Sequence, residues 1–227
     1  MSPKRPIGGL AGVLASICAL LLSACASGPP PPDWQINAKA ALEHALVAYL
    51  TGDTRSEAAE LERARRDVAR TGRVDLLARV ELAHCAARVA SLAFEPCTRF
   101  DTLRADASPV ERAYADYLAG RLKSADTGLL PPVHRAAAES TAETAADALR
   151  AMDDPLSRLV AAGVLFRSQR ARPAVIALAV ETASAQGWQR PLLAWLKVQL
   201  ALAEKAGAGA EAARIKRRIA VVQGEQG

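Results

Sequence analysis

Aromatic residues are scarce in this chain of 227 residues, which holds three phenylalanines, three tyrosines and three tryptophans. Runs in which valine, threonine and tyrosine alternate with polar residues, the usual signature of strands, are absent. Apolar residues make up 51% of the sequence and alanine is conspicuous among them, which suits closely packed helices. The sequence therefore predicts an all-α protein and not a sandwich of strands.

Sequence signals for catalysis and for metal binding are lacking as well. There is no Gly-x-Ser-x-Gly elbow, no glycine-rich phosphate loop and no His-Glu-x-x-His zinc helix. His44, His84 and His134 are far apart, which favours partly buried or surface histidines over a metal site. His84 and Cys85 are neighbours on a predicted helix and point about 100° apart, so they do not form a nucleophile and base. We expect no catalytic residue, no metal site and no cofactor.

The first 24 residues have the pattern of a secretory signal peptide. Lys4 and Arg5 precede an apolar run over residues 7–22, and two small residues close the segment. The alternative is an uncleaved transmembrane anchor, because the run approaches the roughly 18 residues that favour a membrane span. The glycines that interrupt the run and its small-residue exit favour the cleaved peptide.

The segment Leu22-Ser23-Ala24-Cys25 resembles the lipobox of bacterial lipoproteins, a resemblance confined to the first 25 residues. It implies that Cys25 receives a diacylglycerol, that residues 1–24 are removed, and that the new amino terminus is acylated, for instance with palmitate. By the same resemblance, Ala26 and Ser27 in place of an aspartate imply passage to the outer membrane. The lipoprotein would face the periplasm and contact the lipid bilayer through acylated Cys25.

A proline run follows the cysteine and divides the anchor from the rest of the chain. Residues 27–32 (SGPPPP) favour an extended polyproline II spacer of about 3.1 Å per residue. We therefore expect a lipidated cysteine and proline-rich linker over residues 25–32 and an all-helical periplasmic domain over residues 33–227. Loss of Lys4 and Arg5 with the signal peptide leaves 27 of the 29 basic residues against 24 acidic ones, a net charge of +3. This balance gives no reason to expect nucleic-acid binding.

Two cysteines remain in the mature chain, because Cys18 lies in the signal peptide and Cys25 takes the lipid. An even number of cysteines in an oxidising compartment predicts a disulfide between Cys85 and Cys97. The alternative is two unpaired thiols that behave as small apolar side chains. Closing so short a loop would stabilise the fold by about 3 kcal/mol.

Capping motifs and glycine stops divide the domain into successive helices. Thr54-Arg55-Ser56-Glu57 and Ser108-Pro109-Val110-Glu111 both fit the capping-box pattern at a helix start. Pro131-Pro132 predicts the start of one alanine-rich helix that continues to about residue 152. The helix that opens at Pro191 is apolar around most of its circumference, which predicts an interior helix.

Residues 45–64 (ALVAYLTGDTRSEAAELERA) resemble a tetratricopeptide unit. Ala45 takes the small position of the first helix, Gly52-Asp53 the turn, and Leu61 and Ala64 the large and small positions of the second. Glu57 departs from the small residue expected after the turn, and the middle of the chain does not keep the period. The resemblance implies an array of antiparallel helix pairs, as a degenerate tetratricopeptide-like α-solenoid or a helical bundle.

Stacked helix pairs leave an extended surface on which such proteins bind peptides or partner proteins. The leading hypothesis is a scaffold for an unidentified envelope protein in envelope assembly, secretion or cell-wall synthesis, by analogy of fold. The alternative is an envelope ligand-binding protein or enzyme, with a cleft between helix pairs where His134, Arg135 and Glu139 converge. A purely structural lipoprotein without a groove is a third hypothesis.

Basic residues cluster on two predicted helices. One cluster is Arg63, Arg65, Arg66 and Arg70, and the other is Arg214, Lys216, Arg217 and Arg218. Each is either a solvated helix face or a contact for an anionic envelope component, such as lipopolysaccharide phosphates or lipid headgroups.

Overall fold

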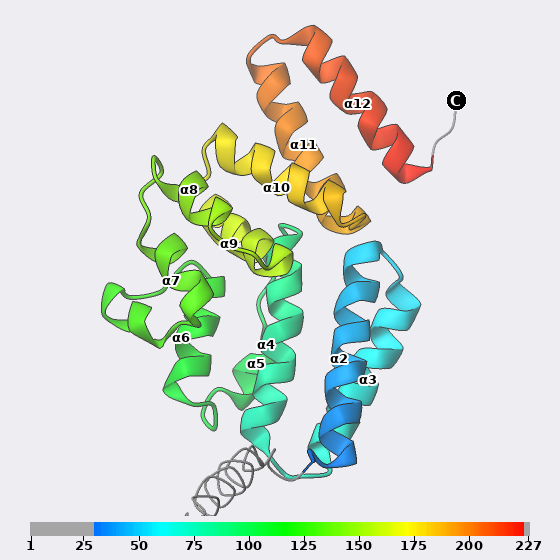
Figure 1. Cartoon of the computed structure of the whole chain (residues 1–227), viewed down its shortest axis with the longest axis vertical. Coiled ribbons are helices and arrows are strands. Elements are labelled where there is room, and N and C mark those ends of the chain that lie inside the picture. The colour runs from blue at the N-terminus through cyan, green and yellow to red at the C-terminus, as the bar shows by residue number, and fades with distance from the viewer. Residues whose placement is uncertain (1–29, 225–227) are drawn as a thin grey trace, which may run out of the picture. The chain divides into compact units, whose positions relative to one another are not determined.

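The computed structural model describes residues 30–224, and every regular element in this range is a helix. The all-α prediction is therefore confirmed for the described residues. The predicted signal peptide, Cys25 and the first part of the predicted linker lie outside them. In chain order the helices are α2 (Asp33–Thr51), α3 (Thr54–Ala69), α4 (Val74–Ala90), α5 (Thr98–Leu103), α6 (Pro109–Leu118), the 3-10 helix η1 (Ser124–Leu129), α7 (Pro132–Glu139), α8 (Ala145–Arg150), α9 (Pro155–Arg167), α10 (Pro173–Ala185), α11 (Gln189–Lys205) and α12 (Gly209–Gln223) (Figure 1).

Helices α2, α3 and α4 pack together through small side chains. Ala41, Ala45 and Ala64 are almost fully buried and share one apolar cluster with Leu61 and with Val80 of α4. Alanine brings helix axes close together and loses no side-chain entropy on burial. Helices α2 and α3 are joined by the two residues Gly52 and Asp53.

A larger apolar core surrounds α4 and joins it to α6, α9, α10 and α11. Gly163 of α9 lies against the backbone of Val89, where an added Cβ atom would fall well inside van der Waals contact with the Val89 carbonyl oxygen. The indole of Trp195 in α11 is fully buried and donates a hydrogen bond from Nε1 to the Ala90 carbonyl oxygen, at 3.0 Å. Two segments far apart in the sequence, α4 and α9–α11, therefore form one core.

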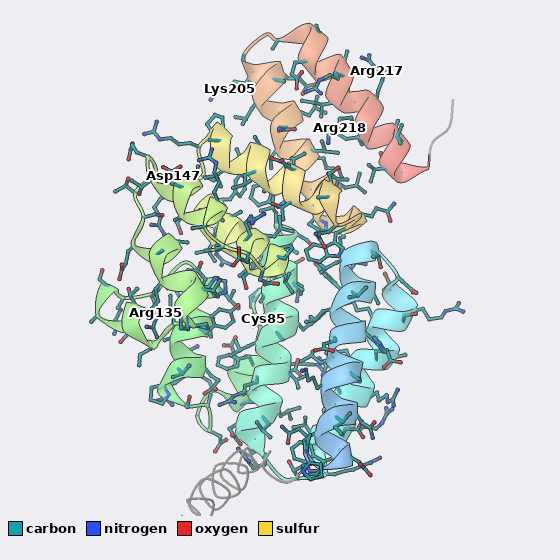
Figure 2. All side chains as sticks on the ribbon, viewed as in Figure 1. Cys85, Arg135, Asp147, Lys205, Arg217 and Arg218 are labelled. Atoms are coloured by element: carbon teal, nitrogen blue, oxygen red, sulfur yellow. A yellow bond between two sulfur atoms is a disulfide. The ribbon has the colours of Figure 1, made fainter. Side chains whose placement is uncertain are left out.

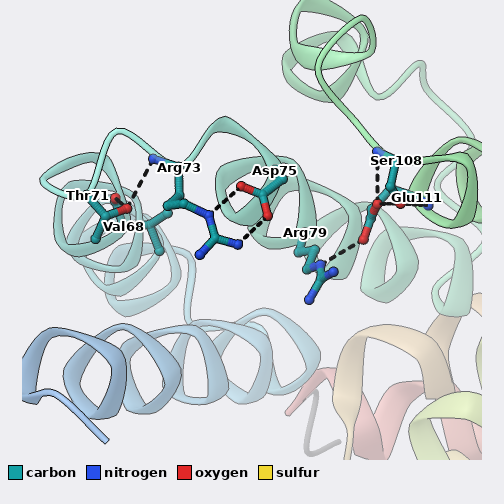
Figure 3. Close-up of polar contacts among 7 residues, drawn as sticks. All are labelled: Val68, Thr71, Arg73, Asp75, Arg79, Ser108 and Glu111. Carbon is teal, nitrogen blue, oxygen red and sulfur yellow. Dashed lines mark hydrogen bonds and ion pairs between the residues drawn. The ribbon is translucent and has the colours of Figure 1, made fainter.

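The predicted capping box at the start of α6 is confirmed. The Ser108 backbone N–H donates to Glu111 Oε2 at 3.0 Å, and the Ser108 hydroxyl caps the first turn in return. Glu111 also accepts a hydrogen bond from Arg79 Nε of α4, at 2.7 Å (Figure 3). These contacts hold the pKa of the Glu111 carboxyl below its usual range against the opposing effect of burial. A local capping motif thus also joins α6 to α4.

The capping box predicted at Thr54 is wrong by one residue. Asp53 is the N-cap of α3, and its carboxylate accepts a hydrogen bond from the Ser56 backbone N–H at 3.0 Å. Asp53 occupies the N-cap position in place of Thr54 because its carboxylate is a strong hydrogen-bond acceptor at the positive end of the helix. Glu57 is thereby freed from capping and makes the contacts described below.

The single helix predicted from Pro132 to about residue 152 is also wrong, because α7 ends at Glu139 and α8 begins at Ala145. Thr141 Oγ1 accepts hydrogen bonds from the backbone N–H groups of Glu143 and Thr144, at 3.2 and 3.4 Å. Threonine side chains that bond to nearby backbone in this way compete with helix hydrogen bonds. The break therefore follows from polar residues that interrupt the alanine run.

Helix α11 is less interior than its apolar sequence predicts. Leu192, Trp195 and Leu196 in its first half are buried, whereas Leu202 near its end is 40% exposed. The main neighbours of α11 are α10 and α12 (Figure 1). No helix among residues 30–224 is long and apolar enough to cross a membrane.

Candidate functional site

A groove of about 540 Å³ lies between α3, α4 and the segment that leads into α5. We call it the charged groove, because charged side chains predominate along its walls. Its lining residues are Glu57, Ala58, Leu61, Glu62, Arg65, Glu81, His84, Cys85, Arg88, Pro96, Cys97, Thr98 and Arg99. Their acidic and basic groups lie on both walls, so the electrostatics of the groove depend on which charges are paired.

Arg65 and Glu81 form a buried ion pair across the two walls. Arg65 Nε and Nη2 donate to the two carboxylate oxygens of Glu81, at 2.6 and 2.7 Å. Glu81 is 4% exposed, and its hydrogen bonds raise the pKa of the Arg65 guanidinium. Bidentate pairs of this kind fix the relative orientation of the helices that carry them. The pair holds α3 against α4 at the base of the groove.

Glu57 connects the groove to the C-terminal helices. Its Oε1 lies 3.0 Å from His84 Nε2, and its Oε2 accepts a hydrogen bond from Arg190 Nη1 at 3.1 Å. The Arg190 guanidinium also lies 4.2 Å from the centre of the Tyr49 ring, within cation–π range. Burial raises the pKa of the Tyr49 hydroxyl, so this side chain stays neutral. One carboxylate thus connects α3, α4 and α11.

Two arginines at the rim of the groove differ in their pairing. Arg88 donates from Nη2 to Glu95 at 2.6 Å. Arg99 is exposed and forms no ion pair with any of residues 30–224. The interior charges of the groove are therefore neutralised in place, and Arg99 leaves a local positive charge at its mouth.

Cys85 and Cys97 separate the charged groove from a smaller cavity of about 90 Å³ on the other side. Their Cα atoms are 6.0 Å apart and their sulfur atoms lie at disulfide distance. Cys85 is on α4 (Figure 2), and Cys97 is the residue before α5. The structure thus brings together the two cysteines that the sequence pairs, and the bridge itself stays a prediction.

The structure does not bring together the residues of the predicted cleft. His134 is buried, with its ring centre 5.5 Å from that of Tyr114 and 5.2 Å from that of Tyr117. Arg135 and Glu139 are exposed, and Arg135 Nε donates to the Leu130 carbonyl oxygen at 2.9 Å (Figure 2). The expected convergence of all three on one cleft is wrong. Positions 135 and 139, four residues apart, share the exposed face of α7, whereas His134 lies on the buried face.

The three histidines lie in separate environments. His44 is exposed on α2, His84 lines the charged groove and His134 lies in the core. Among residues 30–224, no three histidine, cysteine or acidic side chains are grouped as metal ligands would be.

The basic cluster on α3 is largely paired within its own helix. Arg63, Arg65 and Arg66 lie within 4.0 Å of Glu60 or Glu62, and Arg70 lies 3.4 Å from Asp67. These pairs connect positions three or four residues apart, where side chains of a helix meet. The cluster is therefore mainly a solvated helix face.

The basic cluster on α12 is only partly paired. Arg214 pairs with Glu211 and Lys216 with Glu204, at 2.7 and 2.8 Å. Arg217 and Arg218 project from α12 without an ion-pair partner in the described part of the chain (Figure 2). They border a shallow groove of about 310 Å³, which also includes Ser184, Leu192, Val221 and Val222.

Comparisons of the chain with protein-family models, with curated proteins and with solved structures found no match.

Proposed function

We propose that this chain is an outer-membrane lipoprotein that faces the periplasm and holds a partner protein of the envelope in its charged groove. Support for the anchor comes from the order of charged, apolar and small residues before Cys25 and from the proline run after it. A lipid anchor with two or more chains keeps a protein stably on the membrane, and a polyproline spacer holds the folded part away from it.

We also propose that the helices form a degenerate tetratricopeptide-like array. Short turns join α2 to α3, α10 to α11 and α11 to α12, and each of the last two pairs is in extensive contact. The elements α5 to α8 are shorter and interrupt this pattern. Arrays of this class leave a surface between units that accepts peptide segments.

The main observation in support of the proposal is that two carboxylates lining the charged groove, Glu57 and Glu81, are already bound by side chains of the protein. Glu81 is held by Arg65, and Glu57 is contacted by both His84 and Arg190. A general acid or base needs a proton-transfer group left available for a substrate, whereas a recognition surface gains specificity from fixed charges. The groove therefore favours binding of a polar peptide segment over catalysis.

The groove is tested with a photo-crosslinking amino acid placed in living cells at Ala58 or, as the matched control, at Ala59. Both residues are exposed on α3, but only Ala58 lines the groove. We expect Ala58 to crosslink one defined envelope protein and Ala59 to crosslink it much less. Equal labelling from both positions, or none from Ala58, contradicts the proposal.

The anchor is tested separately with Cys25→Ala. This variant is expected to lose metabolic acyl labelling and to remain unprocessed or leave the membrane fraction, because the thiol that takes the lipid is gone. Unchanged acyl labelling contradicts the lipid assignment and leaves the groove proposal standing. Crosslinking from Ala58 in the Cys25→Ala background then measures how far partner capture depends on the tether.

A second candidate function is contact between α12 and an anionic envelope component. It is favoured by Arg217 and Arg218, which form no ion pair within residues 30–224 and lie beside Val221, which is 77% exposed. Each basic side chain near an anionic membrane contributes about 1 kcal/mol of attraction. Binding to vesicles that contain phosphatidylglycerol is expected to weaken in the double variant Arg217→Gln, Arg218→Gln. The matched control is Arg63→Gln, Arg66→Gln on α3, and equal loss in both variants contradicts this role for α12.

A further inference from the structure

A small polar cavity lies away from the charged groove, between α6, η1 and α9. Its volume is about 90 Å³, and its polar lining comes from Tyr117, Ser124, Thr127, Ser168 and Arg170. A space of this size accommodates a ligand of only a few heavy atoms or a small group of water molecules. The side chains of Tyr117 and Arg170 indicate the chemical class of ligand that fits the cavity.

Tyr117 contributes a hydroxyl group that is buried without a partner. The residue is 2% exposed, and its hydroxyl makes no hydrogen bond to any of residues 30–224. Its ring is fixed by packing against Tyr114 and His134. Burial raises the pKa of this hydroxyl, which therefore keeps its proton and is available as a donor. Buried hydroxyl groups are rarely left unsatisfied, and Tyr117 lines the cavity, so a molecule held there is a candidate partner for this hydroxyl.

Arg170 brings a positive charge that forms no ion pair with a carboxylate among residues 30–224. Its Nη1 donates to the carbonyl oxygens of Ala138 and Ser140, at 3.2 and 2.6 Å, and so completes the C-terminal end of α7. It forms no ion pair within the described residues, and no acidic side chain lines the cavity. The Nε and Nη2 groups make no hydrogen bond within residues 30–224 and are left as a two-donor edge.

We propose that this cavity binds a small carboxylate, held by Arg170 and by the hydroxyl of Tyr117. A guanidinium edge matches the two oxygens of a carboxylate, and such charge-assisted bonds are stronger than neutral ones. The Ser168 hydroxyl donates to the Val164 carbonyl at 2.8 Å, so its remaining lone pairs suit a donor group beside the carboxylate. The carboxylate is either that of a free small acid or the C-terminal carboxylate of a peptide, and the site is independent of the charged groove.

The test measures binding to the purified full chain by calorimetry and by the rise in melting temperature. The probes are acetate, N-acetyl-alanyl-alanine, the C-terminal amide of that dipeptide and inorganic phosphate, each at constant ionic strength with chloride as the reference. Acetate and the dipeptide acid are expected to bind, and the amide is not. A stronger response to the dipeptide acid identifies a peptide C-terminus as the source, and a stronger response to acetate identifies a free acid.

Tyr117→Phe is expected to weaken carboxylate binding about tenfold, since it removes one hydrogen bond to a charged group. Without ligand this variant is expected to keep the wild-type melting temperature, because the lost hydroxyl has no protein partner. Tyr114→Phe, whose hydroxyl does not line the cavity, is the matched control. Thr127→Val is a second variant that removes a cavity hydroxyl at constant shape and is expected to weaken binding less.

Three results overturn the proposal. The first is no response to either acid, which leaves only water in the cavity. The second is equal binding by wild type and Tyr117→Phe. The third is binding of inorganic phosphate but not of acetate, which assigns the cavity to another class of anion.

Discussion

Arg190 Nη1 lies 3.1 Å from Glu57 Oε2, although the two residues are 133 positions apart in the chain. The same guanidinium covers the ring of Tyr49, and the same carboxylate contacts His84. A wall of the charged groove is therefore positioned by a residue of α11 that does not line the groove itself. Changes in the C-terminal helices are expected to reach the groove through this contact.

Replacing Arg190 tests this connection. Arg190→Met keeps much of the apolar stem but removes the hydrogen bonds and the cation–π contact, with an expected loss of about 1 to 2 kcal/mol in the free energy of unfolding. Urea denaturation measures the loss, and crosslinking from Ala58 reports whether the groove changes. Arg172→Met is the control, because Arg172 is exposed and pairs with exposed Glu143. Equal losses in the two variants contradict a special role for Arg190.

Breaking the ion pair at the base of the groove is expected to be costly. Glu81→Gln removes the bidentate counter-charge of the Arg65 guanidinium, whose side chain is 15% exposed, and leaves it only the more distant Glu62 at 3.8 Å. We expect a loss of about 3 kcal/mol in the free energy of unfolding, measured by urea denaturation. The double variant Arg65→Met, Glu81→Leu is expected to recover most of that loss, since it removes both charges. A double variant as unstable as Glu81→Gln contradicts this account of the pair.

Gly163→Ala tests the close approach of α9 to α4. In most exposed helices this change is stabilising, because alanine is the better helix former. Here the added methyl meets the Val89 backbone, so we expect a loss of about 1 to 3 kcal/mol in the free energy of unfolding by chemical denaturation. Gly209→Ala at the start of α12 is the control, because nothing lies within 4 Å of its added Cβ. A Gly163→Ala variant as stable as wild type refutes the close packing.

The bridge between Cys85 and Cys97 is tested by mass spectrometry of the non-reduced protein. We expect a peptide pair joined through the two cysteines and a mass lower by two hydrogen atoms than after reduction. Reduction is expected to lower the free energy of unfolding by about 3 kcal/mol, because the closed loop no longer restricts the unfolded chain. Two free thiols in the non-reduced periplasmic protein contradict the prediction.

His134 is expected to make the stability of the protein depend on pH. Burial lowers the pKa of its imidazole from 6.5 to about 4. Below pH 6.5 the His134 imidazole is protonated in the unfolded chain but remains neutral in the folded chain. The free energy of unfolding therefore decreases as the pH falls from 6.5 toward 4. The loss is roughly 3 kcal/mol. Urea denaturation of wild type and His134→Phe across this range measures it, with His44→Gln as an exposed control, and the same slope in wild type and His134→Phe contradicts the assignment.

Local signals in the sequence predicted local features of the fold. Ser108 and Glu111 are three residues apart, and their capping box is present because both partners belong to one helical turn. Pro109, Pro155 and Pro173 each occupy the first turn of a helix, where the missing N–H costs nothing. Cys85 and Cys97 lie close because the chain turns back between α4 and α5, which contact each other.

The candidate site depends on contacts that no local signal reveals. The sequence predicted Glu57 as part of a capping box. No pattern in the sequence around its partner Arg190 indicates a contact with α3. Glu81 offered a usable signal, since a charged residue between Val80 and Leu82 in a buried stretch needs a partner such as Arg65. The cavity beside Tyr117 is lined by residues between positions 117 and 170, and no local sequence pattern indicates that they meet.

Trp195, which donates a hydrogen bond to the Ala90 carbonyl oxygen, also serves as an intrinsic fluorescence probe. Trp195 is fully buried, whereas Trp34 and Trp188 are only partly buried, so its emission is expected at the shortest wavelength of the three. The indole spans the junction where the end of α4 meets α11, and water entering that junction shifts the emission to longer wavelength. A fluorescence titration therefore follows the separation of the N-terminal and C-terminal helices directly, without an added label.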